Sequence, residues 1–200
     1  MQWALARGEK KTGVSLFWLD EGMDTGPVQA MLETAIEDDE DAPALLGRLT
    51  ALGVDLLGAQ LEHLARGEVS RKPQTGEASL APLIKRDDAR LDLSRPAEEL
   101  HNLVRAFRSW PRAWLELSNG KVLVLKTALA SASDPAGNAA EGAVLAIDRS
   151  RGILVQCSSR SRLWFLEVQP EGKKPLNAAE FANGLRLAAG GFLPLSGKQI

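Results

Sequence analysis

An acidic loop holds the side chains that are best placed to do chemistry in this sequence. Residues 20–27, DEGMDTGP, combine three acids with two glycines and a proline, which is typical of a turn. Asp20 and Asp24 are its candidate functional carboxylates. An acidic, glycine-rich loop taken alone is more typical of a solvated turn, so a catalytic role needs support from its surroundings. We expect Gly22 and Gly26 to supply positive-φ backbone geometry.

Histidine and cysteine offer little further chemistry. His63 and His101 lie in two predicted helices, and we expect both to be structural or surface residues. The single cysteine, Cys157, excludes an internal disulfide and a zinc site built on a CxxC pair. It lies in the apolar run GILVQC, which predicts an inert thiol in a core. We expect no metal site.

Two strands and a long helix must position the acidic loop. Residues 12–19 are nearly all apolar, as in a strand covered on both faces, and residues 28–36 resume an extended pattern. The loop therefore joins neighbouring strands. From residue 44 to 65 leucines recur at helical spacing, which predicts one amphipathic helix, with Gly53 as a point of interruption. No apolar stretch reaches the length that a membrane-spanning helix requires, and we expect no membrane contact.

The second half of the chain predicts a helix followed by a small β-rich domain. Residues 67–86 lack periodicity and are the predicted linker. A helix follows, with Ser94 as its N-cap and Pro111 marking its end. A second helix starts near the chain's end, with Asn177 as its N-cap. Turns separate five strand-like segments, which favours a small five-stranded barrel of the OB type; the segments are 113–118, 121–130, 142–148, 152–157 and 162–169.

Charge divides the chain into two unequal parts. Residues 1–84 carry 7 Lys and Arg against 14 Asp and Glu, and residues 85–200 carry 17 against 12. Only the second part has a positive balance, so it is the part that could approach a polyanion. The first residues lack the apolar centre and cleavage site of a signal peptide, and we expect a cytoplasmic protein.

Three separated blocks resemble one known family. QWALARGEKKTGVSLFWLDEGMDTGPV resembles the end of the catalytic domain of the bacterial methionyl-tRNA formyltransferases, including an acidic D-x-G-x-D-T-G loop. ARLDLSRPAEELHNLVRAFRSWPRAWLEL resembles the start of their C-terminal domain. GKKPLNAAEFANGLRL resembles the closing motif of that domain. The blocks occur in the family's order and cover most of the chain.

The resemblance implies an α/β fold. Residues 1–66 would be the remnant of a Rossmann-like formyltransferase domain, residues 67–86 a linker, and residues 87–200 an OB-like β-barrel that binds tRNA. It also implies transfer of a formyl group from 10-formyltetrahydrofolate to the amino group of methionyl initiator tRNA. We expect folate and this tRNA as partners, no metal cofactor, and a monomer when the enzyme is complete.

The resemblance assigns the family's catalytic Asp to Asp24, with Asp20 as the competing candidate. In this role the carboxylate fixes the orientation of an imidazole and favours its charged form. Asp20, Gly22, Thr25 and Gly26 would form the folate loop. The tRNA-binding candidates are basic residues of the linker, of the helix end and of the closing motif. They are Lys85, Arg86, Arg105, Arg108, Arg112, Lys173 and Lys174.

The family's catalytic Asn and His lie near an S-L-L-P-x-x-R-G segment that this sequence does not contain. We therefore expect an N-terminal truncation or a start codon assigned too late, and no formyl transfer by these 200 residues alone. Two alternatives stay open. One is a formyltransferase that acts on a nucleotide-linked amino sugar, and the other is a non-catalytic RNA-binding module.

Overall fold

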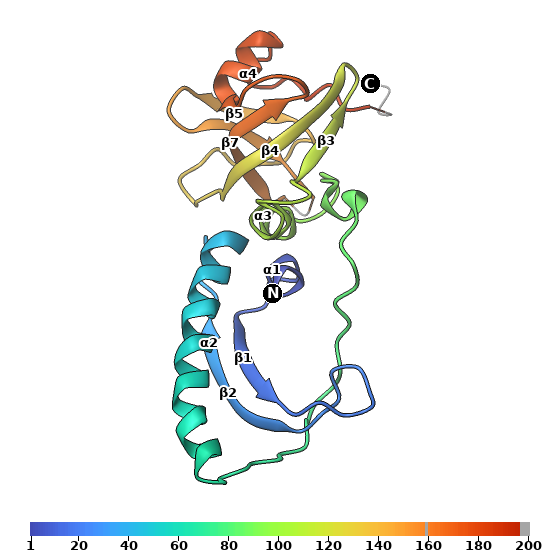
Figure 1. Ribbon diagram of the computed structural model, residues 1–200. Helices are drawn as coiled ribbons and strands as arrows, with labels where there is room; N and C mark the ends of the chain where they lie inside the picture. Colours follow the sequence, from blue (N-terminus) through green and yellow to red (C-terminus); the bar gives the residue numbers. More distant parts are fainter. Residues whose placement is uncertain (159, 197–200) are drawn as a thin grey trace. The chain divides into compact units, whose positions relative to one another are not determined.

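The computed structural model describes residues 1–158 and 160–196, which form two compact units (Figure 1). The first unit contains Met1 and residues 9–83, and the second contains residues 2–8 and the chain from residue 84 onward. The division after residue 83 lies inside the segment 67–86 that we predicted as the linker. Residues 2–8 belong to the second unit although they precede the first unit along the chain.

The first unit is a two-stranded antiparallel sheet with one helix against it. β1 (Lys11–Phe17) pairs with β2 (Val28–Ala35), with a register shift at the Leu16/Phe17 step. α2 (Ala42–Ala65) contacts both strands. Exposed and half-buried residues alternate along β1, so the prediction of a strand covered on both faces is wrong. No parallel pair occurs among the described strands of this unit, in contrast to the parallel sheet of a Rossmann-like domain.

α2 is one continuous helix with defined ends. The side chain of Asp41 accepts a hydrogen bond from the Ala44 amide at 3.1 Å, which satisfies a backbone donor that the first turn leaves open. Gly53 lies inside the helix without interrupting it. The helix ends before Gly67, whose φ of +77° permits the left-handed turn that follows.

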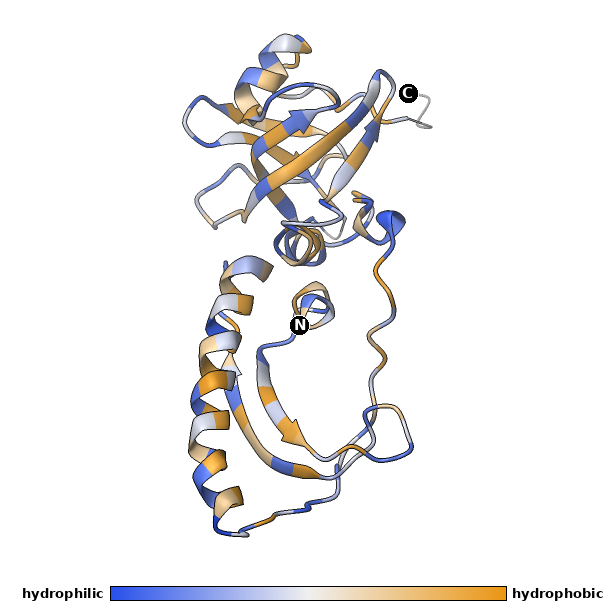
Figure 2. Cartoon of the chain, viewed as in Figure 1, coloured by the Kyte–Doolittle hydropathy of each residue, from blue (hydrophilic) through white to orange (hydrophobic). Residues whose placement is uncertain are grey.

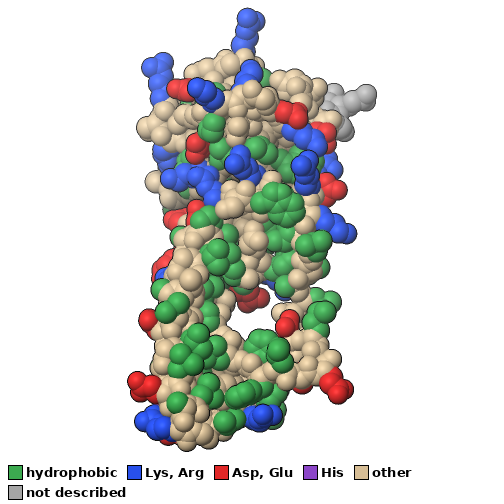
Figure 3. Space-filling model, viewed as in Figure 1, with side chains coloured by type: hydrophobic (Ala, Val, Ile, Leu, Met, Phe, Trp, Pro, Cys, Tyr) green, Lys and Arg blue, Asp and Glu red, His purple; other side chains and the backbone are tan. Residues whose placement is uncertain are grey.

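α2 has two apolar sides, and only one of them is covered. Leu45, Leu49 and Leu56 are buried on the inner side. Apolar residues recur along the whole helix (Figure 2), and hydrophobic side chains lie on the surface over it (Figure 3). By length and composition alone, this helix of 24 residues could cross a membrane, which the sequence analysis did not foresee. Core helices of soluble proteins meet the same criterion, so it decides nothing alone. The exposed apolar residues include Leu46, Val54, Leu57 and Leu61.

The second unit is built on a six-stranded antiparallel sheet. Its strand order is β3-β4-β7-β6-β5, and the short β8 pairs with β7. The first five strands match the five predicted segments, and β8 was not predicted. The bounds are Trp114–Leu117 (β3), Gly120–Leu129 (β4), Val144–Asp148 (β5), Gly152–Gln156 (β6), Arg162–Pro170 (β7) and Leu176–Asn177 (β8).

This sheet does not close, so the predicted OB-like barrel is not confirmed. β3 and β5 lie at its two edges and do not pair with each other in the described chain. The C-terminal segment occupies backbone groups at both edges instead. The Ser118 amide, directly after β3, donates to Pro194 at 2.7 Å, and the Val144 amide of β5 donates to Gly191 at 2.8 Å. An irregular segment therefore takes the bonds that a barrel would use to close.

Short helices cover the sheet and complete the core of the second unit. Pro96 is the N-cap of α3, and the Ala97 amide donates to the Ser161 hydroxyl at 2.8 Å, so the prediction of Ser94 as the cap is wrong. α3 also ends before Pro111. Asn177 caps α4 as predicted, accepting from Ala179 at 2.7 Å. The helices are α1 (Gln2–Ala6), the 3-10 helix η1 (Arg86–Ala89), α3 (Ala97–Ala106) and α4 (Ala178–Gly184).

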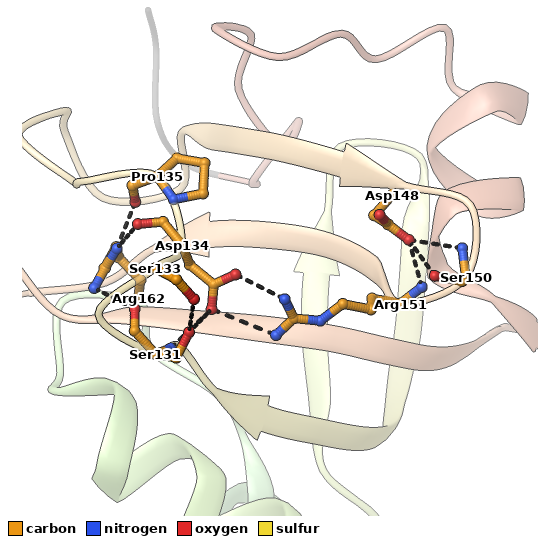
Figure 4. Close-up of polar contacts among 8 residues, drawn as sticks. All are labelled: Ser131, Ser133, Asp134, Pro135, Asp148, Ser150, Arg151 and Arg162. Atoms are coloured by element: carbon orange, nitrogen blue, oxygen red, sulfur yellow. Dashed lines mark hydrogen bonds and ion pairs between the residues drawn. The ribbon is translucent and has the colours of Figure 1, made fainter.

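A polar network fixes the loop between β4 and β5 (Figure 4). Arg151 Nη1 lies 2.7 Å from Asp134 Oδ1, and the Arg151 guanidinium lies 4.1 Å from the centroid of the Trp164 ring. The hydrogen bonds from Arg151 and from the Ser131 amide hold the pKa of Asp134 well below its usual range. Arg162 donates to the carbonyls of Asp134 and Pro135. These bonds anchor the loop to the sheet.

Candidate functional site

The acidic loop has a defined conformation because bonds hold both of its ends. The Trp18 amide, directly after β1, donates to Pro27 at 2.9 Å just before β2. The Trp18 indole donates to the Ser70 carbonyl at 2.9 Å. Gln74 Nε2 donates to the carbonyls of Asp24 and Gly26, at 2.7 and 2.8 Å. Residues 70–74, in the predicted linker, therefore support the loop from outside.

The two candidate aspartates of the loop differ in what they do. Asp20 Oδ1 accepts from the Gly22 amide at 3.0 Å and from the Thr25 hydroxyl at 2.8 Å. This bonding ties the turn together. Asp24 has a φ of +57°, and its carboxylate is exposed. Among the described contacts the Asp24 carboxylate makes no bond within the protein, so of the two candidate aspartates it is the one whose oxygens are both open to another group.

The acidic loop requires glycine at positions 22 and 26 for a different physical reason from the one we expected. Neither Gly22 nor Gly26 has a positive φ; that backbone conformation occurs at Asp24. A Cβ at Gly26 would lie 1.6 Å from the Trp18 carbonyl oxygen, and one at Gly22 would lie 2.1 Å from the Thr25 hydroxyl. Close approach of neighbouring atoms, and not handedness, requires glycine at both positions.

The described histidines and cysteine all have structural partners. His63 is paired with Glu68, and the buried His101 shares a hydrogen bond of 2.9 Å with the Thr127 hydroxyl. Burial raises the pKa of Cys157 to about 12, and the nearby Glu141 adds to the shift, so the thiol is inert at neutral pH. Within residues 1–158 and 160–196, no group of three His, Cys, Asp or Glu side chains could hold a metal ion.

Two of the predicted basic residues contact Gln169 of β7, and a third lines a cavity with it. Arg112 Nη1 lies 3.4 Å from Gln169 Oε1, and Gln169 Nε2 donates to the Lys173 carbonyl at 2.8 Å. Arg86 lines the same cavity as Gln169. Lys85 and Lys174 are exposed. Figure 3 shows Lys and Arg side chains gathered over the face of the second unit that it displays.

Two of the predicted basic residues have structural roles. Arg105 is 6% exposed, and its Nε donates to Asn102 Oδ1 at 2.8 Å, so burial removes it from the surface that tRNA could reach. Arg108 is half-buried and donates to the Leu125 carbonyl of β4. We assigned Arg105 by charge alone, but α3 is buried at this position.

The sequence analysis also missed several residues that lie beside Arg86. Trp110, Trp114 and Lys121 line one cavity with it, and Arg90 lies over the Trp114 ring. The WPRAW segment carries a usable signal, because two tryptophans four residues apart flank an arginine and a proline. We used that segment only to recognise the family motif.

Family models match both units. The model described as "Formyl transferase" matches residues 1–61, and the model described as "Formyl transferase, C-terminal domain" matches residues 83–186. A protein of Myxococcus xanthus named methionyl-tRNA formyltransferase is 44% identical over 95% of this chain. The chain spans 59% of the length of that relative.

Solved structures share the fold at lower sequence identity. HypX from Aquifex aeolicus, in complex with tetrahydrofolic acid, matches with a TM-score of 0.67 and 20% identity, over 94% of this chain and 33% of that one. An N-formyltransferase from Helicobacter canadensis, in complex with folinic acid and dTDP-3-aminofucose, matches with a TM-score of 0.59 and 17% identity, over 81% and 58%. At these identities the likeness establishes the fold alone.

Proposed function

Because the chain belongs to the formyl transferase family, we propose that it serves the transfer of a formyl group from 10-formyltetrahydrofolate to methionyl initiator tRNA. The name and the 44% identity of the Myxococcus relative favour this acceptor over an amino sugar. The chain spans 59% of that relative, so the activity is proposed for the whole enzyme of which these residues supply two units. We place this activity in the cytoplasm.

The reaction is an acyl transfer through a tetrahedral intermediate. The amino nitrogen of methionine attacks the formyl carbon and later loses a proton, while the bond from that carbon to N10 of the folate breaks and N10 gains a proton. Negative charge develops on the formyl oxygen and needs fixed donors. A positioned acid or base must move the protons. The family resemblance assigns these two tasks to an Asn and a His outside this sequence, and the third group, a carboxylate, to Asp24.

The free carboxylate of Asp24 is the observation that carries this assignment. Both loop bonds of Asp20 are accepted by its Oδ1 and hold its own turn together, whereas neither carboxylate oxygen of Asp24 is used in the turn among the described contacts. The Asp24 backbone is held by Gln74, so the side chain starts from a fixed Cα position. In the proposed enzyme Asp24 accepts a hydrogen bond from an imidazole and keeps that ring oriented and charged. Folate binds beside the loop.

The second unit supplies the tRNA contacts in this proposal. Arg86 lines the cavity beside Gln169, the Arg112 side chain contacts Gln169, and the Lys173 backbone carbonyl accepts from it. With Lys85 and Lys174, these residues would form the basic surface. Such side chains bind phosphates and give affinity with little sequence information. Arg105 is buried and is not part of this surface.

A formyl transfer assay of a fusion protein tests the proposed function. The chain would be assayed alone and after fusion to the part of the Myxococcus relative that this sequence does not match, with 10-formyltetrahydrofolate and methionyl-tRNA as substrates. We expect turnover from the fusion and none from the 200 residues alone. Turnover by the chain alone would contradict the assigned roles of the Asn and His. A fusion that formylates a nucleotide-linked amino sugar and not the tRNA would overturn the proposed acceptor.

A further inference from the structure

Trp110 differs from the other tryptophans of this chain in having an open ring. Four of the five carry a cationic side chain near the ring face, with the charged group 4.1 to 5.7 Å from the centroid: Trp3, Trp18, Trp114 and Trp164. Trp110 has no such contact among the described residues, and it is 51% exposed. Exposing half of a tryptophan is costly in water, so a ligand that covers the ring would gain free energy.

A cavity of about 400 Å³ lies against Trp110. This volume falls within the range of small-molecule sites in proteins. Trp114 is mostly buried in the wall of the cavity, where its indole donates to the Arg86 carbonyl at 3.1 Å. The Lys121 ammonium lies 4.3 Å from the centroid of the Trp114 ring. The cavity therefore combines a fixed aromatic wall, an exposed aromatic ring and a cation.

The charges around the cavity favour an anionic ligand. Arg86 and Lys121 line it directly, and the Arg112 guanidinium contacts Gln169, which also lines it. Two acids, Asp87 and Glu171, line it as well. Arg90 is not counted in this balance because it lies 3.7 Å from Glu116. Three basic side chains thus stand against two acidic ones at a site that carries an open tryptophan.

We propose that this cavity binds an unpaired nucleotide of the RNA, with the base stacked on Trp110 and the phosphate held by Arg86 and Lys121. The identity of the RNA as methionyl-tRNA rests on the proposed function, but the stacking site does not. An RNA base has a π face that pairs with tryptophan, and each nucleotide brings one negative charge to the basic rim. A proline-rich peptide would match the aromatic rings but leave the three basic side chains without a partner.

Binding of a short single-stranded RNA to the whole chain tests the stacking site. The probe is a fluorescently labelled RNA of four adenosines, and a second probe keeps the same ribose-phosphate chain without bases. We expect W110A to weaken binding of the adenosine probe about tenfold, since loss of base stacking on an aromatic side chain has effects of this order. W110F retains most of the affinity because it keeps a ring. Neither variant changes binding of the probe without bases.

F192A is the matched control, because Phe192 is another exposed aromatic residue of the second unit that does not line the cavity. Its affinity for the adenosine probe should equal that of the unchanged chain. Equal affinity of W110A and the unchanged chain would overturn the proposal, as would equal losses in W110A and F192A. Binding of an oligoproline peptide that depends on Trp110, with no such dependence for RNA, would also overturn it.

The formyl transfer assay separates this inference from the proposed function. If the fusion does not formylate tRNA but W110A still loses affinity for the adenosine probe and not for the probe without bases, the stacking site stands and the proposed function fails. If the fusion is active and W110A binds both probes as the unchanged chain does, the stacking site fails alone.

Discussion

Residues 9–83 and the second unit differ in how completely they bury their apolar side chains. Among the described residues, five apolar side chains are buried in the first unit and thirty in the second. The first unit also exposes a row of apolar residues along α2 and has an acidic surplus, whereas the second unit has a basic one. A two-stranded sheet with one helix has little core of its own, whereas six strands with helices on them make a self-sufficient one.

The difference has a functional meaning in the proposed enzyme. The unit with the smaller core holds the carboxylate assigned to chemistry, and the unit with the larger core holds the basic surface and the tryptophan cavity. A fixed core suits a surface that must bind RNA in one orientation. The exposed side of α2 suits a unit that is covered when the catalytic part of the family is assembled around it.

The largest expected effect is the loss of a buried leucine in the second unit. Leu154 of β6 is fully buried, and L154A should lower the free energy of unfolding by about 2 to 5 kcal/mol. Leu129 of β4 is 46% exposed, and L129A should cost less than about 1 kcal/mol. Urea unfolding followed by tryptophan fluorescence measures both. Equal losses would mean that the second unit lacks the core described here.

Amide hydrogen exchange compares the two units in one experiment. We expect amides of β6 and β7 to exchange more slowly than those of β1 and β2, by a factor on the order of 100 or more, because opening free energies follow the size of the core around each strand. The measurement is mass spectrometry of peptides after timed deuterium labelling. Similar protection of both strand pairs would contradict the difference in core size between the two units.

The basic surface predicts a salt dependence that the acidic unit does not share. Replacing Arg112 and Lys173 together by Gln should reduce the slope of the logarithm of tRNA affinity against the logarithm of salt concentration by about one for each lost phosphate contact. R149Q, an exposed arginine in the turn between β5 and β6, is the control. If R149Q lowers the slope as much per charge, the tRNA contacts are not localised around Gln169.

A smaller effect is expected from acid. The lowered pKa of Asp134 means that the ionised carboxylate stabilises the folded state relative to the unfolded state. This stabilisation is present above the ordinary pKa of 3.8 and is lost as pH falls towards the lowered value. D134N should therefore lower the urea midpoint at pH 7, and the difference from the unchanged chain should narrow below pH 3.8. E171Q serves as an exposed control. A difference that does not change with pH would contradict the role of the ionised carboxylate.

Local patterns predicted the elements well because their physical causes are local. Strand-like runs separated by turns located the five strands from residue 113 to 169, and leucine spacing located α2. The acidic loop was placed correctly between two strands for the same reason. The different roles of Asp20 and Asp24 could not be predicted from the sequence, because they depend on which carboxylate accepts the hydrogen bond of the Thr25 hydroxyl.

Features that depend on distant parts of the chain were beyond such patterns. The sheet of the second unit does not close, because residues 191–196 form backbone hydrogen bonds at both of its edges. These residues lie more than forty positions after β5 in the sequence. The Ser161 hydroxyl, which accepts the hydrogen bond of the first amide of α3, is distant in sequence from Ala97. The burial of Arg105 follows from how α3 packs on the sheet, which charge alone does not reveal.

Formyl transfer by aspartate variants of the fusion tests the central claim most directly. Asn at position 20 keeps an oxygen that can accept the bonds of the turn, whereas Asn at position 24 removes the charge that the proposed imidazole needs. We predict that D24N lowers kcat by about 100-fold or more and that D20N stays within about tenfold of the unchanged fusion. A D24N fusion as active as the unchanged one, or a D20N fusion with the greater loss, would contradict the assignment.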